Sequence, residues 1–91
     1  MVKNTEKWFV YIILCSDQSL YTGISKDVNK RFEQHLNKKG AKYFYARAPV
    51  KVVYKESFKN HGEALSREYA IKKLSSKQKK LMIKGNVSLT N

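Results

Sequence analysis

Four side chains in the first half of the chain carry functional groups that could act together. Tyr11 and Tyr21 lie ten residues apart in two short apolar segments, and Arg31 and His35 are four residues apart in a segment with helical periodicity. Residues four apart share one face of a helix, so the guanidinium and the imidazole can converge on one group. A free histidine has a pKa near ~6.5 and a free tyrosine near ~10, so the histidine accepts a proton more readily at neutral pH.

The overall charge indicates what these groups would act on. The 91 residues include 19 Lys and Arg against 7 Asp and Glu, a net charge of +12. Such an excess favours a polyanion as partner, nucleic acid first and an anionic membrane second, with a charged solubility surface as the simplest alternative. The membrane hypothesis lacks a strongly amphipathic helix with large exposed apolar residues. Glycine-rich phosphate loops, zinc-ligand pairs and nucleophile-elbow serines are absent, and so few scattered acids exclude a carboxylate cluster for two metals.

The elements that must position these residues follow from the apolar pattern. We expect one domain over residues 1–91, with a core at about 8–82, because the chain is too short for two. Apolar β-branched runs predict strands at 8–14, 20–24 and 50–57, the first covered on both faces and paired with the second as a hairpin. Helices are expected at about 27–38, 61–74 and 76–84, with a short helical turn within 41–48. The class is α+β, a small three-stranded antiparallel sheet flanked by helices in the order β-β-α-(α)-β-α-α.

Capping residues set the expected helix ends. Ser25 or Asp27 can begin the first helix and Gly40 would end it, with Val28, Phe32 and Leu36 as its core stripe. Two capping boxes would begin the later helices, and Gly85 would end the last one; the boxes are Asn60 with Glu63 and Ser75 with Gln78. Gly23, near the end of the second strand, indicates a bulge or a place where another backbone or a ligand comes close.

Several of these residues together resemble a known family. The segments Phe9-Val10-Tyr11 and Tyr21-Thr22-Gly23, then Arg31-x-x-x-His35 and a later helical Glu68, resemble the GIY-YIG nucleases, above all their short single-domain bacterial branch. The likeness covers about residues 8–82. The chain departs from the motif at Phe9 and Thr22, and Ile24 stands where some branches carry a lysine that helps activate the nucleophile, which leaves His35 as the helper.

The resemblance implies a metal-dependent endonuclease that hydrolyses DNA phosphodiester bonds, in DNA repair or processing, and leaves a 5′-phosphate and a 3′-hydroxyl. Arg31 would bind a non-bridging oxygen, Tyr11 or His35 would take the proton of the attacking water, and Tyr21 would orient water or phosphate. Gly23 would be structural at this site. Glu68 is implied as the ligand of one divalent ion, Mg²⁺ or Mn²⁺, since a single carboxylate suits a metal that keeps its waters. Taken alone, each residue has an ordinary structural explanation.

Further cations would hold the nucleic acid. Some interleave with tyrosines after the first helix and others lie on the later helices: Lys38, Lys39, Lys42, Arg47, Lys72 and Lys73. The expected partner is DNA, with RNA as a second candidate, no membrane, a cytoplasmic location, and a monomer or weak homodimer. The alternative function is a nucleic-acid-binding module that uses the same basic surface without catalysis.

Overall fold

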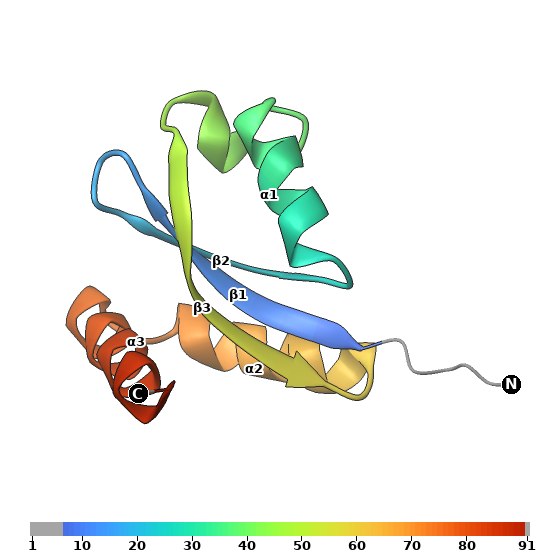
Figure 1. Ribbon diagram of the computed structural model, residues 1–91, viewed down its shortest axis with the longest axis vertical. Coiled ribbons are helices and arrows are strands. Elements are labelled where there is room, and N and C mark those ends of the chain that lie inside the picture. Colours follow the sequence, from blue (N-terminus) through green and yellow to red (C-terminus); the bar gives the residue numbers. More distant parts are fainter. Residues whose placement is uncertain (1–6, 91) are drawn as a thin grey trace, which may run out of the picture.

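The computed structural model describes residues 7–90, with side chains through residue 85, and shows a three-stranded antiparallel sheet between helices (Figure 1). The strands lie in the order β2-β1-β3, with the bounds β1 Trp8–Cys15, β2 Leu20–Ser25 and β3 Pro49–Phe58. The helices are α1 Val28–Leu36, the short 3-10 helix η1 Lys42–Tyr45, α2 His61–Lys72 and α3 Ser76–Thr90. The expected α+β class, strand pairing and element order are therefore confirmed.

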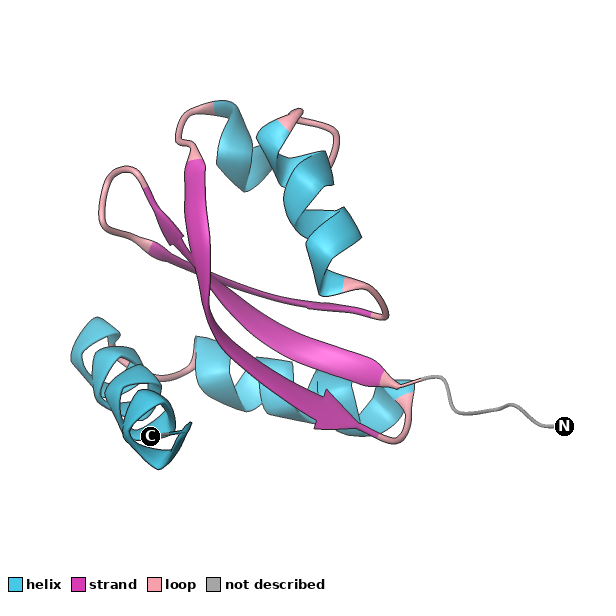
Figure 2. Cartoon of the chain, in the orientation of Figure 1, coloured by secondary structure: helices cyan, strands magenta, loops and turns pink. Residues whose placement is uncertain are grey.

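The central strand β1 is covered on both faces, as expected, because its side chains alternate between two hydrophobic clusters. Val10 and Ile12 point to the side of α2, where they pack with Tyr54, Ala64 and Ile71. Tyr11, Ile13 and Cys15 point to the other side, where they pack with Val28 of α1 and Phe44 of η1. Figure 2 shows α1 and α2 on opposite sides of the sheet. Any site that uses residues of both helices must therefore reach across the sheet or around its edge.

The predicted caps begin the helices. The Asp27 carboxylate accepts a hydrogen bond from the Lys30 backbone N–H (3.0 Å), and Asn60 caps α2 in the same way through Glu63 N–H (2.9 Å). The capping box before α3 is complete, since Gln78 N–H donates to Ser75 Oγ (3.1 Å) and Ser75 N–H donates to Gln78 Oε1 (2.9 Å). These bonds satisfy backbone donors that have no partner within the helix.

Two expected helix ends are wrong. The first helix ends at Leu36, and Lys38 turns the chain with a φ of 58°, so Gly40 lies beyond the helix instead of capping it. Gly85 does not end the last helix, because α3 continues to Thr90. Gly85 does not adopt the left-handed conformation with which a glycine commonly ends a helix, and a Cβ there would meet no atom from another part of the molecule within 4 Å.

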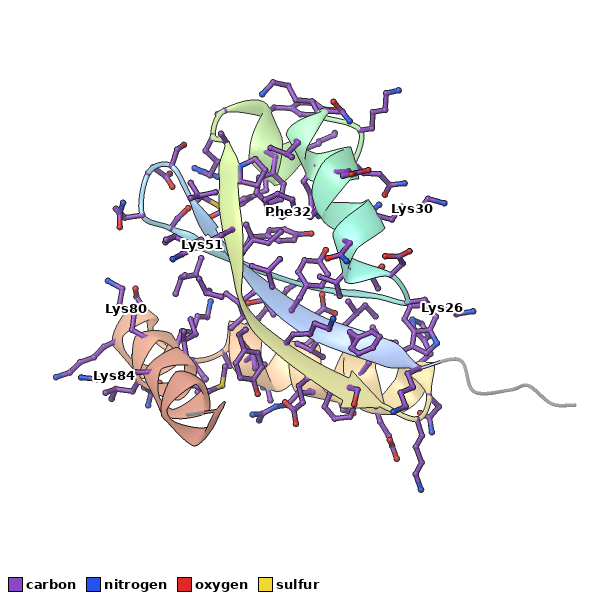
Figure 3. All side chains as sticks on the ribbon, in the orientation of Figure 1. Lys26, Lys30, Phe32, Lys51, Lys80 and Lys84 are labelled. Atoms are coloured by element: carbon purple, nitrogen blue, oxygen red, sulfur yellow. The ribbon has the colours of Figure 1, made fainter. Side chains whose placement is uncertain are left out.

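The core stripe of α1 also differs from the expected one. Val28 is buried and Phe32 points from α1 toward the sheet (Figure 3), but Leu36 is 51% exposed and His35 is fully buried in its place. At about 100° per residue, position 35 lies roughly 20° from position 28 around the helix axis and position 36 roughly 80° away. The geometry of a helix therefore turns His35 toward the sheet. Among residues 7–90, no helix is long and apolar enough to cross a lipid bilayer.

Candidate active site

The site is centred on a buried hydrogen bond between β1 and α1. Tyr11 Oη lies 3.1 Å from His35 Nε2, and the two residues are 1% and 0% exposed. The hydrophobic alternation of β1 points Tyr11 to the side of α1, and the helical period points His35 back at it. The hydrogen bond from α1 therefore fixes the position of the Tyr11 hydroxyl within a cluster that is otherwise apolar.

Gly23 makes room for the Tyr11 ring. The two residues are partners in the register between β1 and β2, and the ring lies across the glycine. A Cβ at position 23 would stand 2.6 Å from Tyr11 Oη and 2.8 Å from its Cζ, closer than side chains approach each other. Gly23 has no positive φ, so space and not backbone conformation requires the glycine. The group that comes close to Gly23 is thus the side chain of Tyr11, and not the other backbone or ligand expected at this position.

Tyr21 and the aromatic residues of η1 enclose the same pair. The Tyr21 ring centroid lies 5.3 Å from that of His35 and 6.3 Å from that of Tyr11. Tyr43 and Phe44 pack against Tyr21 at 5.2 Å and 4.8 Å. Aromatic edges and faces in contact hold each ring in one orientation. The two tyrosines of the motif therefore form one aromatic group with His35.

Arg31 lies one turn before His35 on α1. Its Nη1 donates to Gln34 Oε1 at 2.9 Å, a bond that helps to hold the guanidinium in place. The positive charge acts on its neighbours, because it favours the ionised form of both tyrosines and disfavours the protonated form of His35. Arg31 therefore belongs to the site, although its side chain is only partly buried.

Glu68 approaches the same group from α2, the helix that covers the other face of the sheet. Desolvation is the main reason that the pKa values of Tyr11 and Tyr21 are raised, and the negative charge of Glu68 adds a smaller contribution to both, so the carboxylate acts electrostatically on both phenols. The carboxylate is 17% exposed and pairs with the Lys72 ammonium at 3.2 Å. A hydrogen bond and ring contacts thus join Tyr11, Tyr21 and His35, and the charges of Arg31 and Glu68 act on the two tyrosines from α1 and α2.

Burial keeps the central pair neutral at physiological pH. Desolvation, with a smaller contribution from Tyr21, raises the pKa of Tyr11 to about 12. Desolvation and the nearby Arg31 lower the pKa of His35 to about 4. A neutral imidazole has one acceptor nitrogen, and with Nε2 in that role the Tyr11 hydroxyl donates to it. The other nitrogen, Nδ1, is buried and has no hydrogen-bond partner among the described residues.

The donor set around Glu68 decides which kind of metal fits. Within the described part of the chain, no three His, Cys, Asp or Glu side chains gather closely enough to hold an ion. A closed structural zinc site needs four such ligands and is therefore excluded there. One partly buried carboxylate suits a hard divalent cation that takes its other ligands from water and substrate oxygens.

The cations expected to hold nucleic acid lie on three parts of the surface. Lys39 and Lys42 are exposed around η1, whereas Lys38 Nζ donates to the Phe44 carbonyl oxygen at 3.2 Å. The Arg47 guanidinium lies 4.0 Å from the Tyr43 ring centroid and pairs with Asp17 at 2.7 Å, so a phosphate would have to replace Asp17.

The two cations on α2 also have partners. Lys72 pairs with Glu68, and the Lys73 ammonium lies 4.3 Å from the Tyr69 ring centroid. Lys72 therefore stands beside the candidate site itself, while Lys73 lies with an exposed tyrosine on the helix surface.

Two residues of the site were not expected from the sequence. Gln34, three positions after Arg31, holds its guanidinium, and that spacing on one helix could have indicated the pair. Gly40 packs directly on the His35 ring, where a Cβ would collide with Nδ1. Its role depends on the turn after α1, and the local sequence suggests only a helix end.

Comparison with known proteins agrees with this geometry. The model of the GIY-YIG catalytic domain matches residues 7–81. The chain belongs to the GIY-YIG family. UPF0213 proteins of Staphylococcus epidermidis and Staphylococcus aureus are 54% and 53% identical over 78 and 76 residues, which cover 86% and 84% of this chain and 95% and 93% of theirs.

Two solved structures, both determined by NMR in solution, resemble the fold. The UPF0213 protein BH0048 from Bacillus halodurans is 38% identical, with a TM-score of 0.56 over 86% of this chain and 83% of that one. The protein EF2693 from E. faecalis is 27% identical, with a TM-score of 0.60 over 94% and 93%. The GIY-YIG family is a nuclease family whose members generally use a divalent metal, and a nucleic-acid substrate follows for this chain.

Proposed function

We propose that this protein is an endonuclease that hydrolyses DNA phosphodiester bonds with one divalent ion, Mg²⁺ or Mn²⁺, held by Glu68. The observation that carries the proposal is the convergence of the Tyr11–His35 pair with the charges of Arg31 and Glu68. A proton acceptor, a phosphate ligand and a metal ligand are parts from which metal-assisted hydrolysis of a phosphodiester can be built. The match to a nuclease family over residues 7–81 supports the same activity.

Tyr11 is the group that meets the attacking water in this proposal. Tyr11 Oη is bonded to His35 Nε2, and Glu68 is among the groups that shift the pKa of Tyr11 but not among those that shift the pKa of His35, so the phenol is the member of the pair on which the carboxylate acts. Tyr11 Oη takes the proton of the water as it passes its own proton to His35 Nε2, 3.1 Å away. Tyr21 orients the water or the phosphate with its hydroxyl.

Arg31 binds a non-bridging oxygen of the scissile phosphate. The Gln34 side chain already holds the guanidinium, so little conformational freedom is lost on binding. Preorganised charge of this kind contributes about 3–4 kcal/mol where single donors have been removed from other enzymes. When bound at Glu68, the divalent ion would stabilise the leaving oxygen and the developing charge and would lower the pKa of the adjacent phenol.

A plasmid-nicking assay tests the activity. Wild-type protein should nick supercoiled DNA with Mg²⁺ or Mn²⁺ and not with EDTA, and Tyr11→Phe, Arg31→Ala and Glu68→Gln should each lose most of the rate. Matched controls are Tyr69→Phe and Glu33→Gln, which alter an exposed tyrosine and an exposed carboxylate outside the cluster and should cleave normally. A wild type that binds DNA as tightly as the Tyr11, Arg31 and Glu68 variants and never nicks it would refute the enzyme and leave a binding module.

A role in DNA repair or processing, a cytoplasmic location and a monomeric or weakly dimeric state belong to the same proposal. A single module cuts one strand at a time, so concerted double-strand cleavage requires a second copy. Light scattering across a range of protein concentrations, run beside the ratio of nicked to linear plasmid, tests the oligomeric state.

A further inference from the structure

A basic groove adjoins the candidate site, and most of its lining residues have no role in the chemistry described above. It has a volume of about 380 Å³ and lies between the start of β1, the end of β2 and the first turns of α1. Its lining includes three cations, Lys26, Lys30 and Arg31, and one carboxylate, Asp27. Arg31 is thus shared between the groove and the site, so a chain that follows the groove reaches the catalytic group.

The acidic residue of the groove is already used by the fold. The Asp27 carboxylate accepts the backbone N–H of Lys30, which is the cap of α1. Ser25 Oγ accepts the Asp27 backbone N–H at 3.0 Å and donates to the Asp27 carbonyl oxygen at 3.1 Å, so the loop between β2 and α1 is closed on itself. Capping disperses part of the carboxylate's charge into the helix end. The side chains of Lys26 and Lys30 therefore dominate the electrostatics of the groove.

Trp8 forms an apolar wall of the groove and holds one of its lysines. The Lys26 ammonium lies 5.3 Å from the centroid of the indole, a cation–π arrangement that keeps it over the groove. The Trp8 ring also contacts the His61 ring, with ring centroids 4.3 Å apart, and this contact links the wall to the start of α2. A fixed cation beside an aromatic surface is the combination that nucleic-acid backbones and sugars contact in grooves of other proteins.

We propose that this groove binds the phosphate that neighbours the scissile one along the substrate strand. Lys26 and Lys30 contact that phosphate while Arg31 holds the scissile phosphate, so the groove sets the direction in which the strand leaves the site. The inference rests on the proposed nuclease function and assigns the substrate's path to residues outside the catalytic group.

The test compares two lysine pairs with the same effect on net charge. Figure 3 shows Lys26 and Lys30 on one side of the molecule and Lys80 and Lys84 on α3 at the other. Both Lys26→Gln/Lys30→Gln and Lys80→Gln/Lys84→Gln reduce the formal charge from +12 by two, to +10. All four side chains are exposed, so neither double variant should unfold. The first double variant should differ from the second only by its contact with the substrate.

Binding of a labelled duplex oligonucleotide is measured by fluorescence anisotropy in EDTA, so that no turnover occurs, from 50 to 200 mM salt. The slope of log affinity against log salt is negative, and its magnitude should decrease by about 0.9 in Lys26→Gln/Lys30→Gln, the loss of one phosphate contact, and should stay at the wild-type value in Lys80→Gln/Lys84→Gln. Equal slopes for the two double variants, or a wild type that does not bind DNA, would overturn the inference.

Nicking kinetics separate the groove from the proposed activity. Lys26→Gln/Lys30→Gln should raise the KM for plasmid and leave kcat unchanged, because its contacts are the same before and during the reaction. A wild type that binds with the expected slopes but never nicks DNA would refute the nuclease and keep the groove as a phosphate site. A wild type that nicks while the two double variants have the same KM would refute the groove alone.

Discussion

Replacing Gly23 by alanine tests whether the Tyr11 hydroxyl has a single allowed position. The added Cβ would stand 2.6 Å from Oη, and ordinary contacts begin near 3.4 Å, so the oxygen must retreat by 3.4 − 2.6 = 0.8 Å. The ring cannot move away freely, because its hydroxyl is bonded to a histidine with no exposed surface. Forcing one more carbon into such a site costs about 1–3 kcal/mol of stability.

The same displacement should lower the nicking rate far more than the stability. A misplacement of about 1 Å at reacting groups costs roughly 10²-fold in rate, so Gly23→Ala should nick DNA about a hundredfold more slowly at a temperature where it remains folded. Urea unfolding followed by circular dichroism gives the free energy of unfolding, and plasmid nicking under single-turnover conditions gives the rate. Tyr11→Phe added to Gly23→Ala removes the shortest contact, so the double variant should be less destabilised than the sum of the two single variants.

Gly85→Ala is the matched control for the backbone. A Cβ there meets nothing within 4 Å, and the residue lies inside α3, so alanine should stabilise the protein by about 0.5–1 kcal/mol and leave the rate unchanged. If Gly23→Ala were as stable and as active as Gly85→Ala, the Tyr11 hydroxyl would not be confined by β2, and the argument for a fixed phenol would fail.

Three further predictions concern other contacts. Burial lowers the pKa of His35 to about 4, so between about pH 6.5 and pH 4 the unfolded chain binds a proton that the folded protein excludes. The free energy of unfolding should therefore fall as the pH is lowered through this range. The fall should be about 3 kcal/mol larger in wild type than in His35→Gln. Parallel urea-unfolding profiles of the two proteins across that range would contradict this. Titration with Mn²⁺ in a calorimeter should show binding by wild type and none by Glu68→Gln. Lys72→Met should bind Mn²⁺ about two- to fivefold more tightly than wild type, because the Lys72 ammonium, 3.2 Å from the Glu68 carboxylate, competes with the ion. Weaker binding by Lys72→Met would argue against a metal at Glu68. Ser75→Ala should lower the free energy of unfolding by about 0.5–2 kcal/mol through loss of its bond from Gln78 N–H, whereas Ser66→Ala, exposed in α2, should leave it nearly unchanged in the same measurement.

Local chemistry was sufficient to predict most of the fold. The β-branched run around Ile12 and Ile13 predicts a strand buried on both faces, and the capping residues predict where the helices begin. Helix ends were harder, because Gly40 and Gly85 have the local character of terminators, but the turn at Lys38 ends the first helix before Gly40, and Gly85 has no positive φ to end α3. Burial of His35 in place of Leu36 was also missed, because hydrophobicity alone favours the leucine.

The sequence predicted which of the proposed site residues share an element better than it predicted how the elements bring them near one another. The i, i+4 spacing of Arg31 and His35 places them on one helix face, and this holds in the structure. Nothing local in the sequence brings Glu68 to the tyrosines, since its helix packs on the other face of the sheet. That approach depends on how α2 lies beneath β1 and β2, which is a tertiary property. The role of Gly23 depends likewise on the cross-strand register with Tyr11.

The division of the site between two hydrophobic clusters makes its assembly depend on the attachment of one helix. Tyr11 is fixed within the cluster on the side of α1, whereas Glu68 is held by α2, whose fully buried side chains are Ala64 and Ile71. Detachment of α2 alone would carry the carboxylate away and leave the phenol–imidazole pair intact. Under the proposed mechanism, the molecule could therefore be folded over most of its length and still lack its metal ligand. A contact that held α2 on the sheet would then favour the active arrangement.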